Sequence, residues 1–324
     1  MGSTQRYAAG CHLSFLEGVH TMLKKRIKKD FSRYGGLYLL VIPVVVYYII
    51  FHYIPMGGVL MAFEDFVPRR GVFKSDWVGV QHFISFFKSY DIWRLIRNTL
   101  RISLTSLIFG FPAPVILALL INEVNNKYFK KFVQTCSYLP HFISMVILCA
   151  MVKEFVSTNG FITQFLVDWF NIEKVSLLIN KNYYVPVHVI SGIWAEIGFG
   201  SIIYLAALSG IDMALYDAAA IDGAGRFKQV LHVTLPGIAP TVIIKLLLAI
   251  GGIMGVGHEK IILLYNEAIY ETSDVISTYV YRKGLVSGEY SFSTAVGLFN
   301  SVINFALIMV ANKISAKVSE VSLW

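Results

Sequence analysis

Charged residues are scarce in this chain. Lys, Arg, Asp and Glu make up 15% of its 324 residues, whereas soluble globular proteins carry about 25%. Hydrophobic residues make up 56%. The composition therefore excludes an ordinary soluble domain and indicates a protein built largely of membrane spans.

Sequence signals of catalysis and metal binding are also missing. No G-x-x-x-x-G-K-[ST] loop occurs, so the chain lacks the usual cradle for the phosphates of ATP. The stretch HEKII, which begins at His258, lacks the second histidine of a metalloprotease helix, and the three cysteines show no zinc-ligand spacing with histidine. No segment marks a nucleophile, although a hydrolytic triad has no fixed spacing. We therefore expect no enzyme, no catalytic residues, and no metal or cofactor bound by this chain.

Six apolar runs are long enough to cross a bilayer, which takes about twenty residues. They cover residues 36–54, 99–122, 134–156, 184–208, 236–257 and 291–312. No soluble domain, low-complexity tract or clear repeat interrupts them. The predicted fold class is therefore an all-α membrane protein with six transmembrane helices, multi-pass in the lipid bilayer.

The positive charges indicate the orientation of these spans. KKRIKKDFSR, residues 24–33, comes just before the first run, and basic residues beside a first span tend to hold that end in the cytoplasm. Six spans then return the C-terminus to the same side. This distribution accounts for the net charge of +8, so we expect no nucleic acid as a partner. Three segments are predicted: a cytoplasmic N-terminal tail over 1–34, which starts at Met1 or Met22, a membrane domain over 35–313, and a cytoplasmic C-terminal tail over 314–324.

Three other segments carry recognisable patterns. Residues 81–98 place apolar side chains at helical spacing among charges, which predicts one amphipathic helix in the membrane interface. FITQFLVDWF, residues 161–170, predicts a short surface helix. The second span contains Pro112 and Pro114, which free backbone groups of the helix. We expect a kink there, which either packs against a neighbouring helix or lines a pathway.

Between the fourth and fifth runs lies YDAAAIDGAGRFKQVLHVTLPGIAP, residues 216–240. Alanine is the best helix former and an aspartate suits the first turn of a helix, so Asp217 predicts the start of a short helix. Gly223 and Gly225 then allow a sharp turn. This stretch is too short of apolar residues to be a span, and we expect it on the cytoplasmic side.

A second short helix is predicted after the glycine corner. Phe227, Val230, Leu231 and Thr234 follow one another at i, i+3, i+4 and i+7, which gives one apolar face. Pro236 is placed to begin the fifth span. The two helices together predict a compact knob, which either docks on a partner or packs on its own chain.

The knob resembles the EAA coupling motif of permease subunits of ATP-binding-cassette importers. In that motif a glutamate and two alanines precede a glycine, and isoleucine-x-leucine-proline follows. The matching positions here are Asp217, Ala218, Ala219 and Gly223, and then Val233, Leu235 and Pro236. Aspartate and valine are conservative departures from the family pattern. RNTLRISLTSLIFGFPAPVILALLINEV and QTCSYLPHFISMVIL also resemble the oligosaccharide and polysaccharide permeases of this group, among them those of bacterial alginate importers.

The resemblance, which covers nearly the whole chain after its N-terminal tail, implies a type I importer permease fold in the bacterial inner membrane. Its coupling helices, over 209–235, would dock on the ATPases through the motif residues together with Asp222 and Phe227. The implied partners are a second homologous permease that forms a heterodimer, two cytoplasmic ATPases that bind ATP and Mg, and an extracytoplasmic solute-binding protein. ATP-driven closure would rock the permeases between inward-facing and outward-facing states.

Polar side chains inside or beside the apolar runs are candidates for a substrate pathway, because ionisable groups within a membrane are costly and usually functional. They are Glu196, Tyr204, Lys245, His258, Lys260, Asn300 and Asn304. Lys245 has an alternative, in which its long side chain snorkels toward the cytoplasm. Asn300 and Asn304 share a helix face and have another, in which they bind a neighbouring helix.

Basic residues in the outer segments favour an acidic, alginate-like oligosaccharide as cargo, because cations along a low-dielectric path attract carboxylates. They are Arg69, Arg70, Lys74, Lys260, Arg282 and Lys283. Contacts with lipid headgroups or with the binding protein are the alternative. Two other classes of protein stay open, a stand-alone secondary transporter and a membrane-embedded polysaccharide enzyme or assembly factor. A docking knob without an ATP site favours the importer subunit over both.

Overall fold

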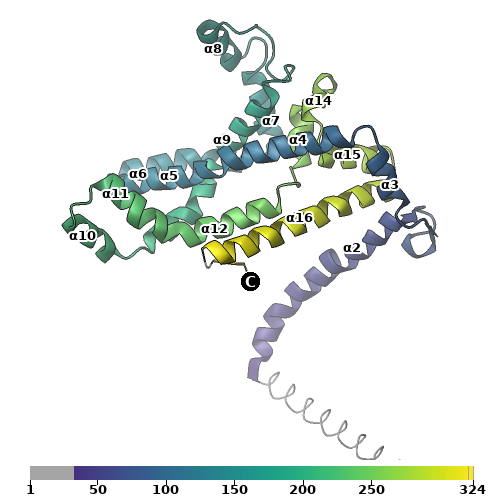
Figure 1. The fold of residues 1–324 in the computed structure, drawn as a ribbon, viewed down its shortest axis with the longest axis horizontal. Coiled ribbons are helices and arrows are strands. Elements are labelled where there is room, and N and C mark those ends of the chain that lie inside the picture. Colours follow the sequence, from purple (N-terminus) through teal and green to yellow (C-terminus); the bar gives the residue numbers. More distant parts are fainter. Residues whose placement is uncertain (1–32, 320, 324) are drawn as a thin grey trace, which may run out of the picture. The chain divides into compact units, whose positions relative to one another are not determined.

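The computed structural model describes residues 33–319 and 321–323 and divides the chain into two units, one up to Leu60 and one from Met61 (Figure 1). The first unit is helical from Arg33, and the apolar helix reaches Phe63. It includes the π turn η1 (Ile49–Tyr53), α2 (Ile54–Met56) and the start of η2 (Gly57–Phe63). This confirms the first predicted span and extends it at both ends. Most of the basic cluster and of the predicted N-terminal tail lie outside the described residues.

Four helices of the second unit are long and apolar enough to cross a membrane. They are Ile92–Glu123, formed by α4 (Ile92–Thr105), η4 (Ser106–Gly110) and α5 (Pro112–Glu123); α9 (Tyr184–Ser209); Arg226–Gly251, formed by α11 (Arg226–Gln229), η6 (Val230–Thr234) and α12 (Leu235–Gly251); and α16 (Tyr290–Val318). They confirm four more predicted spans. The fifth span ends earlier than predicted, at Gly251, and α16 continues past the predicted domain end at 313.

The third predicted span, 134–156, is not one straight helix. The structure has α6 (Lys127–Tyr138) with η5 (Leu139–Phe142), and then α7 (Met145–Phe155), bent by 102° relative to the first part. Ser144 starts α7 as its N-cap, because its side chain accepts a hydrogen bond from the Ile147 amide. Because of this bend, α7 runs across the direction of α6 and does not continue it (Figure 1). Hydropathy alone predicted the apolar length here but not the break.

The prolines of the second span do not break it. Pro112 opens α5, and the turn before it is the π turn η4. A proline lacks the amide hydrogen that an α-helix needs, and π turns absorb such irregularities and are frequent at functional sites. The predicted kink is therefore a π turn in a continuous helix, next to the cavities described below.

Short elements connect these helices. The predicted amphipathic helix 81–98 is in fact two helices, α3 (Gln81–Lys88) and α4, separated at Ser89–Asp91. The predicted surface helix is confirmed as α8 (Phe161–Phe170). The remaining elements are the antiparallel pair β1 (Glu64–Asp65) and β2 (Asp76–Trp77), η3 (Val72–Lys74), α10 (Met213–Ile221), α13 (His258–Leu264), η7 (Glu267–Ile269), α14 (Tyr270–Ser273), α15 (Ile276–Tyr281) and η8 (Arg282–Val286).

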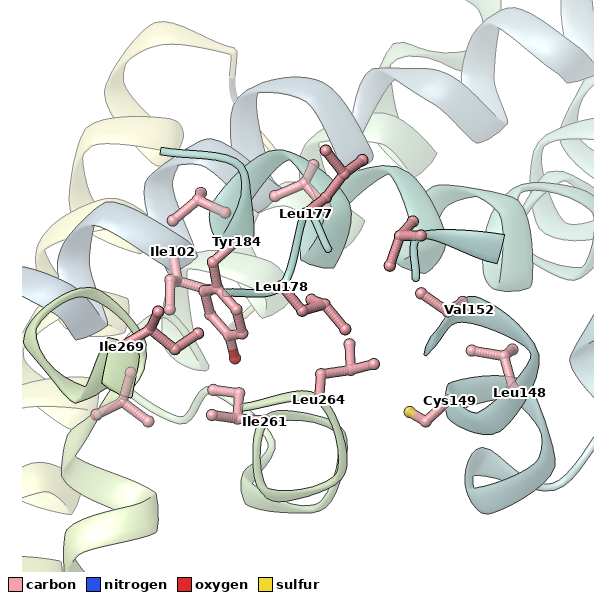
Figure 2. Close-up of a cluster of buried hydrophobic side chains, with 14 of the residues drawn as sticks. Ile102, Leu148, Cys149, Val152, Leu177, Leu178, Tyr184, Ile261, Leu264 and Ile269 are labelled. Carbon is pink, nitrogen blue, oxygen red and sulfur yellow. The ribbon is translucent and has the colours of Figure 1, made fainter. Parts of the chain in front are cut away.

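The largest buried hydrophobic cluster joins α7, α9 and α13. The ring of Tyr184, fully buried at the start of α9, lies among side chains from these helices and from Leu177 and Leu178 (Figure 2). Two smaller clusters join α3, α4 and α16, and α5, α9 and α12. Because burial of apolar area is the main stabilising term, these clusters fix α9 and α13 against each other, next to the polar groups described below.

Candidate functional site

Two regions of the second unit contain most of the predicted coupling residues and two of the predicted pathway residues. The first, which we call the coupling hairpin, consists of residues 212–234 and contains α10, α11 and η6. The second, the central groove, consists of two adjoining cavities between the long helices. In Figure 1, α10 and α11 lie at one end of the unit, and α3 and α15 at the other.

Helix α10 begins earlier than predicted. Asp212 is its N-cap, with its side chain 2.9 Å from the Ala214 amide that donates to it. Asp217 was expected in the first turn and instead lies in the middle of the helix, exposed. The helix ends at Ile221, and Gly223 follows with φ +77°, a conformation that side-chain-bearing residues avoid. The predicted glycine corner is therefore present.

The coupling hairpin exposes the matched motif and several apolar side chains. Asp217, Ala218, Asp222 and Gly223 are exposed, and Ala219 is half-buried. The large apolar residues with exposed side chains are Met213, Leu215, Ile221, Phe227 and Leu231, with Ile221 and Phe227 at 87% and 80%. Exposed apolar groups gathered in one place mark interaction surfaces. The hairpin is therefore a surface suited to contact another chain.

The second helix of the hairpin is continuous with the fifth span. Helix α11 passes through the π turn η6 into α12, so Pro236 sits in the first turn of α12 and does not begin a separate element as predicted. Leu235 precedes it and is half-buried. The predicted apolar face is also divided, because Thr234 is buried whereas Phe227 is exposed. The second arm of the hairpin and the fifth span are thus one continuous helix, Arg226–Gly251.

The central groove lies along the π turn η4. One cavity, of about 320 Å³, is lined by residues of η4, α5, α9 and α13, including His188, Gly192, Glu196 and Lys260. The other, of about 310 Å³, is lined by residues of α4, η4 and the end of α12. Both linings include Ser106, so the cavities adjoin.

The groove contains both signs of charge. Lys260 Nζ donates a hydrogen bond to the backbone oxygen of His188, at 2.7 Å. Glu196 was also predicted for the pathway, and its carboxylate lies 3.1 Å from His141 Nδ1. His188 and Glu196 are eight residues apart on α9, which is about 12 Å along the helix. The groove therefore has a cationic part near Lys260 and an acidic part near Glu196.

Asn300 and Asn304 bind a neighbouring segment. Asn304 Oδ1 accepts a hydrogen bond from the Met254 amide at 3.0 Å, and Asn300 Nδ2 donates to the Met254 carbonyl at 3.1 Å. Met254 follows the end of α12, where the backbone is no longer helical. This geometry favours the second of the two roles considered for these amides.

The other predicted pathway residues lie outside the groove lining. Tyr204 is buried in the cluster of α5, α9 and α12. Lys245 is exposed on α12. His258 is exposed, and its ring stacks on that of Tyr281, with 5.8 Å between ring centroids. The structure thus brings together two of the seven predicted residues, Glu196 and Lys260, in one cavity.

Sequence analysis missed the histidines of this site. His188, Gly192 and Glu196 recur at i, i+4 and i+8 in α9, so they form a stripe on one helix face, and that spacing was a usable signal. His141 had no such signal, because only the bend between α6 and α7 places it near Glu196. Among the described residues, no group of three or more His, Cys, Asp or Glu side chains is arranged to hold a metal ion.

A buried ion-pair network fastens the segment between α13 and α16. The Asp274 carboxylate is fully buried and accepts hydrogen bonds from Arg282 Nη1 and Nη2, at 2.8 and 2.7 Å. Thr278 Oγ1 donates to it at 2.7 Å, and Arg94 of α4 lies 3.5 Å away. Asn98 Nδ2 donates to the Asp274 backbone oxygen at 2.9 Å. The network ties α14 and α15 to α4, so it fixes one boundary of the groove region.

Comparisons with known proteins agree with this architecture. Residues 110–319 match the family model of the "Binding-protein-dependent transport system inner membrane component". The chain is 40% identical over 297 residues to the polygalacturonan/rhamnogalacturonan transport system permease protein YteP of Bacillus subtilis (strain 168), covering 92% of each protein.

Two solved structures are also similar. The first is a bacterial ABC transporter involved in the import of the acidic polysaccharide alginate, with a TM-score of 0.82 and 43% identity over 91% of this chain and 99% of the other. The second is the bacterial alginate ABC transporter in complex with an alginate pentasaccharide-bound periplasmic protein, with the same TM-score and coverage and 42% identity. Both are similar over nearly the whole chain.

Proposed function

The chain belongs to the inner-membrane components of binding-protein-dependent transport systems, and from this membership we propose that it moves an acidic oligosaccharide inward as one of two permease subunits. It is an oligosaccharide permease of an ABC importer, a multi-pass inner-membrane protein and not itself an ATPase. Membership of this family decides against the stand-alone secondary transporter and the membrane-embedded enzyme. ATP and Mg belong to other subunits of the complex.

The acidic cargo rests chiefly on one observation, the ammonium of Lys260 in a groove between membrane helices. A cation held in a low-dielectric passage attracts carboxylates. Two similar proteins support the same chemistry, because one is named for the acidic polysaccharide alginate and the other for polygalacturonan, a polymer of a uronic acid. Arg69 and Lys74 of the outer segment would attract such a sugar at the entrance, and Arg70 beside them is paired with Asp76.

The coupling hairpin supports the assignment of the power source. Its exposed motif residues, Asp217 to Gly223 and then Phe227, would dock on one cytoplasmic ATPase, so this end of the second unit would face the cytoplasm. The basic residues before the first span support a cytoplasmic N-terminus as well, and six spans would return the C-terminus to the same side. A second homologous permease, forming a heterodimer, would receive the other ATPase. A solute-binding protein would deliver the oligosaccharide at the opposite end. The similar alginate transporter forms a complex with an alginate pentasaccharide-bound periplasmic protein, which supports such a partner.

Reconstitution of the whole complex tests this proposal. The chain is purified from its host with the subunits that accompany it and placed in liposomes with the binding protein. Uronic-acid oligomers should then stimulate ATP hydrolysis and be taken up, and neutral oligomers of equal length should not match them. Equal stimulation by neutral sugars would contradict the acidic cargo, and purification without an ATPase would contradict the coupling assignment.

The variant Asp217→Lys tests the docking surface separately. It reverses a charge on the exposed face of α10, and an unpaired charge in an interface costs several kcal/mol, so docking should weaken about tenfold to a hundredfold or more. The matched control is Asp168→Lys, because Asp168 is equally exposed on α8, outside the hairpin. Normal uptake and normal retention of the ATPase by Asp217→Lys would show that the hairpin is not the docking surface.

A further inference from the structure

The central groove contains buried polar atoms without partners. Ser103 Oγ and His188 Nδ1 are buried and make no hydrogen bond within the described part of the chain. Ser103 lines one cavity of the groove and His188 the other. A buried polar atom left unpaired costs about 1–3 kcal/mol, and nearly all such atoms in native proteins are satisfied by protein, water or a ligand. Each of the two cavities of the groove thus has one buried polar atom that lacks a hydrogen-bond partner.

The charge of the groove is also incompletely paired. An ammonium group has three donors, and Lys260 Nζ uses one of them on the His188 carbonyl. No carboxylate lies within ion-pair distance of Lys260 among the described residues, and Glu196, which lines the same cavity, pairs with His141. Two donors of the only lysine that lines the groove are therefore available to another group.

Gly192 keeps the space beside this ammonium open. A Cβ built on Gly192 would lie 3.1 Å from Lys260 Nζ, with no other atom within 4 Å. The cavity on this side, about 320 Å³, falls at the lower end of the range of about 300–1,000 Å³ seen for small-molecule sites. The space, the free donors and the unpaired atoms occur together at the π turn of the second span.

We propose that the central groove is a subsite for one uronic-acid unit of the passing oligosaccharide, with its carboxylate on Lys260 and its hydroxyl groups on Ser103, Ser106 and His188. This inference rests on the proposed function and assigns its selectivity to one place in the membrane. A carboxylate on Lys260 forms charge-assisted hydrogen bonds. Glu196 repels a carboxylate and accepts from hydroxyl groups, so it orients the sugar with its acid group toward Lys260.

If the groove is this subsite, a substitution in it should lower sugar uptake without lowering ATP hydrolysis. Lys260→Met removes the charge while the coupling hairpin and the binding-protein surface stay intact. We expect uptake of a labelled uronic-acid tetramer by the reconstituted complex to fall at least about tenfold, since a lost buried charge contact is worth about 2 kcal/mol or more. ATP hydrolysis stimulated by the loaded binding protein should stay close to that of the wild type.

Three further variants make the test specific. Lys260→Arg keeps the charge and should restore most of the uptake. Lys88→Met removes an exposed lysine of α3 outside the groove and should change nothing. Gly192→Leu fills the space beside the ammonium and should lower uptake as Lys260→Met does, while Gly297→Leu is its control because no atom lies within 4 Å of a Cβ at that position.

The outcomes separate this inference from the proposed function. If the wild type takes up uronic-acid oligomers and both Lys260→Met and Gly192→Leu match it, the subsite is refuted and the function stands. A parallel loss of uptake and of stimulated ATP hydrolysis in assembled Lys260→Met complexes would also refute it, since that pattern shows a structural role. A wild type that takes up no acidic oligomer overturns both. If Lys260→Met fails to assemble, Gly192→Leu decides alone.

Discussion

The hydroxyl of Tyr216 on α10 lies 3.0 Å from Oγ1 of Thr234, the last residue of η6. Thr234 is buried, and its neighbour Leu235 begins α12. The two arms of the coupling hairpin are thus joined at the point where the second arm continues into α12. Helix α10 is therefore linked to α12 both through the glycine corner and through this side-chain contact.

Tyr216→Phe removes this hydrogen bond and leaves the ring in place. A neutral hydrogen bond contributes about 0.5–1.5 kcal/mol, so we expect up to about tenfold weaker coupling between ATP hydrolysis and uptake. The ratio of sugar taken up to ATP hydrolysed in liposomes measures this. Tyr128→Phe, at an exposed tyrosine of α6, should leave the ratio unchanged, and an unchanged ratio in Tyr216→Phe would deny the contact any mechanical role.

Gly223→Ala tests the glycine corner through backbone strain alone. No atom lies within 4 Å of a Cβ built on Gly223, so a side chain at this position would not crowd a neighbour. Its φ of +77° costs a side-chain-bearing residue about 1–2 kcal/mol. We expect weaker retention of the ATPase during purification. Gly225→Ala is the matched control, because Gly225 has φ −68° and open surroundings; equal effects of the two would argue against strain.

Gly198→Ala should destabilise the packing of α6 on α9. A Cβ on Gly198 would overlap the backbone of Ser137, which cannot move as a flexible side chain can. Overpacking of this kind costs about 1–3 kcal/mol or more, and a lower midpoint of thermal unfolding in detergent should reveal it. Gly297→Ala on α16 meets no neighbouring atom and should unfold like the wild type.

Asp274→Asn should be among the most damaging single substitutions. It removes the charge that pairs with Arg282 and Arg94 in a buried setting, and breaking such a pair costs about 3–5 kcal/mol. Thermal unfolding of the purified complex measures the loss. In the ion pair of Arg70 with Asp76 both side chains are exposed. Such a pair contributes about 0–1 kcal/mol to the free energy of unfolding, so Arg70→Ala serves as the control. Similar stability of the two variants would contradict the structural role of the network.

The charge of Lys260 predicts a pH dependence of uptake. Burial lowers the pKa of Lys260 to about 8, while Cys149 and Glu196 act in the opposite direction; His188 and Glu259 are the other titratable groups nearby. Because the charged form is lost as pH rises through this value, uptake of acidic oligomers should fall between about pH 7 and about pH 9. Lys260→Arg stays protonated and should remove the dependence. An equal fall of uptake with pH in Lys260→Arg would show that another group causes the pH dependence.

Hydropathy predicted the spans because lengths of about twenty apolar residues are set by the bilayer. It did not predict the break between Phe142 and Met145, since both arms are apolar and a bend changes no residue type. Residue propensities likewise predicted that α10 starts at Asp217. The helix starts earlier, because the Asp212 side chain caps it by accepting a hydrogen bond from the Ala214 amide. Local capping geometry decided the boundary there.

The groove was predictable only in part. Glu196 and Lys260 stood out as charges near apolar runs, and the α9 stripe would have added His188 and Gly192. The cavity beside the unpaired Ser103 depends on how α4 approaches the end of α12, from far along the chain. Distant packing of that kind leaves no local mark in the sequence.

Asn300 and Asn304 of α16 form hydrogen bonds with Met254 and so tie the end of α12 to α16. Both polar groups of one residue are held from α16, so the non-helical end of α12 cannot slide along its neighbour without breaking both bonds at once. If docking of an ATPase moves α12, we therefore expect α16 to move with it. The glycine-rich stretch Gly251–Gly257 is anchored to α16 at Met254, beside the cavity that Gly252, Ile253 and Val256 line.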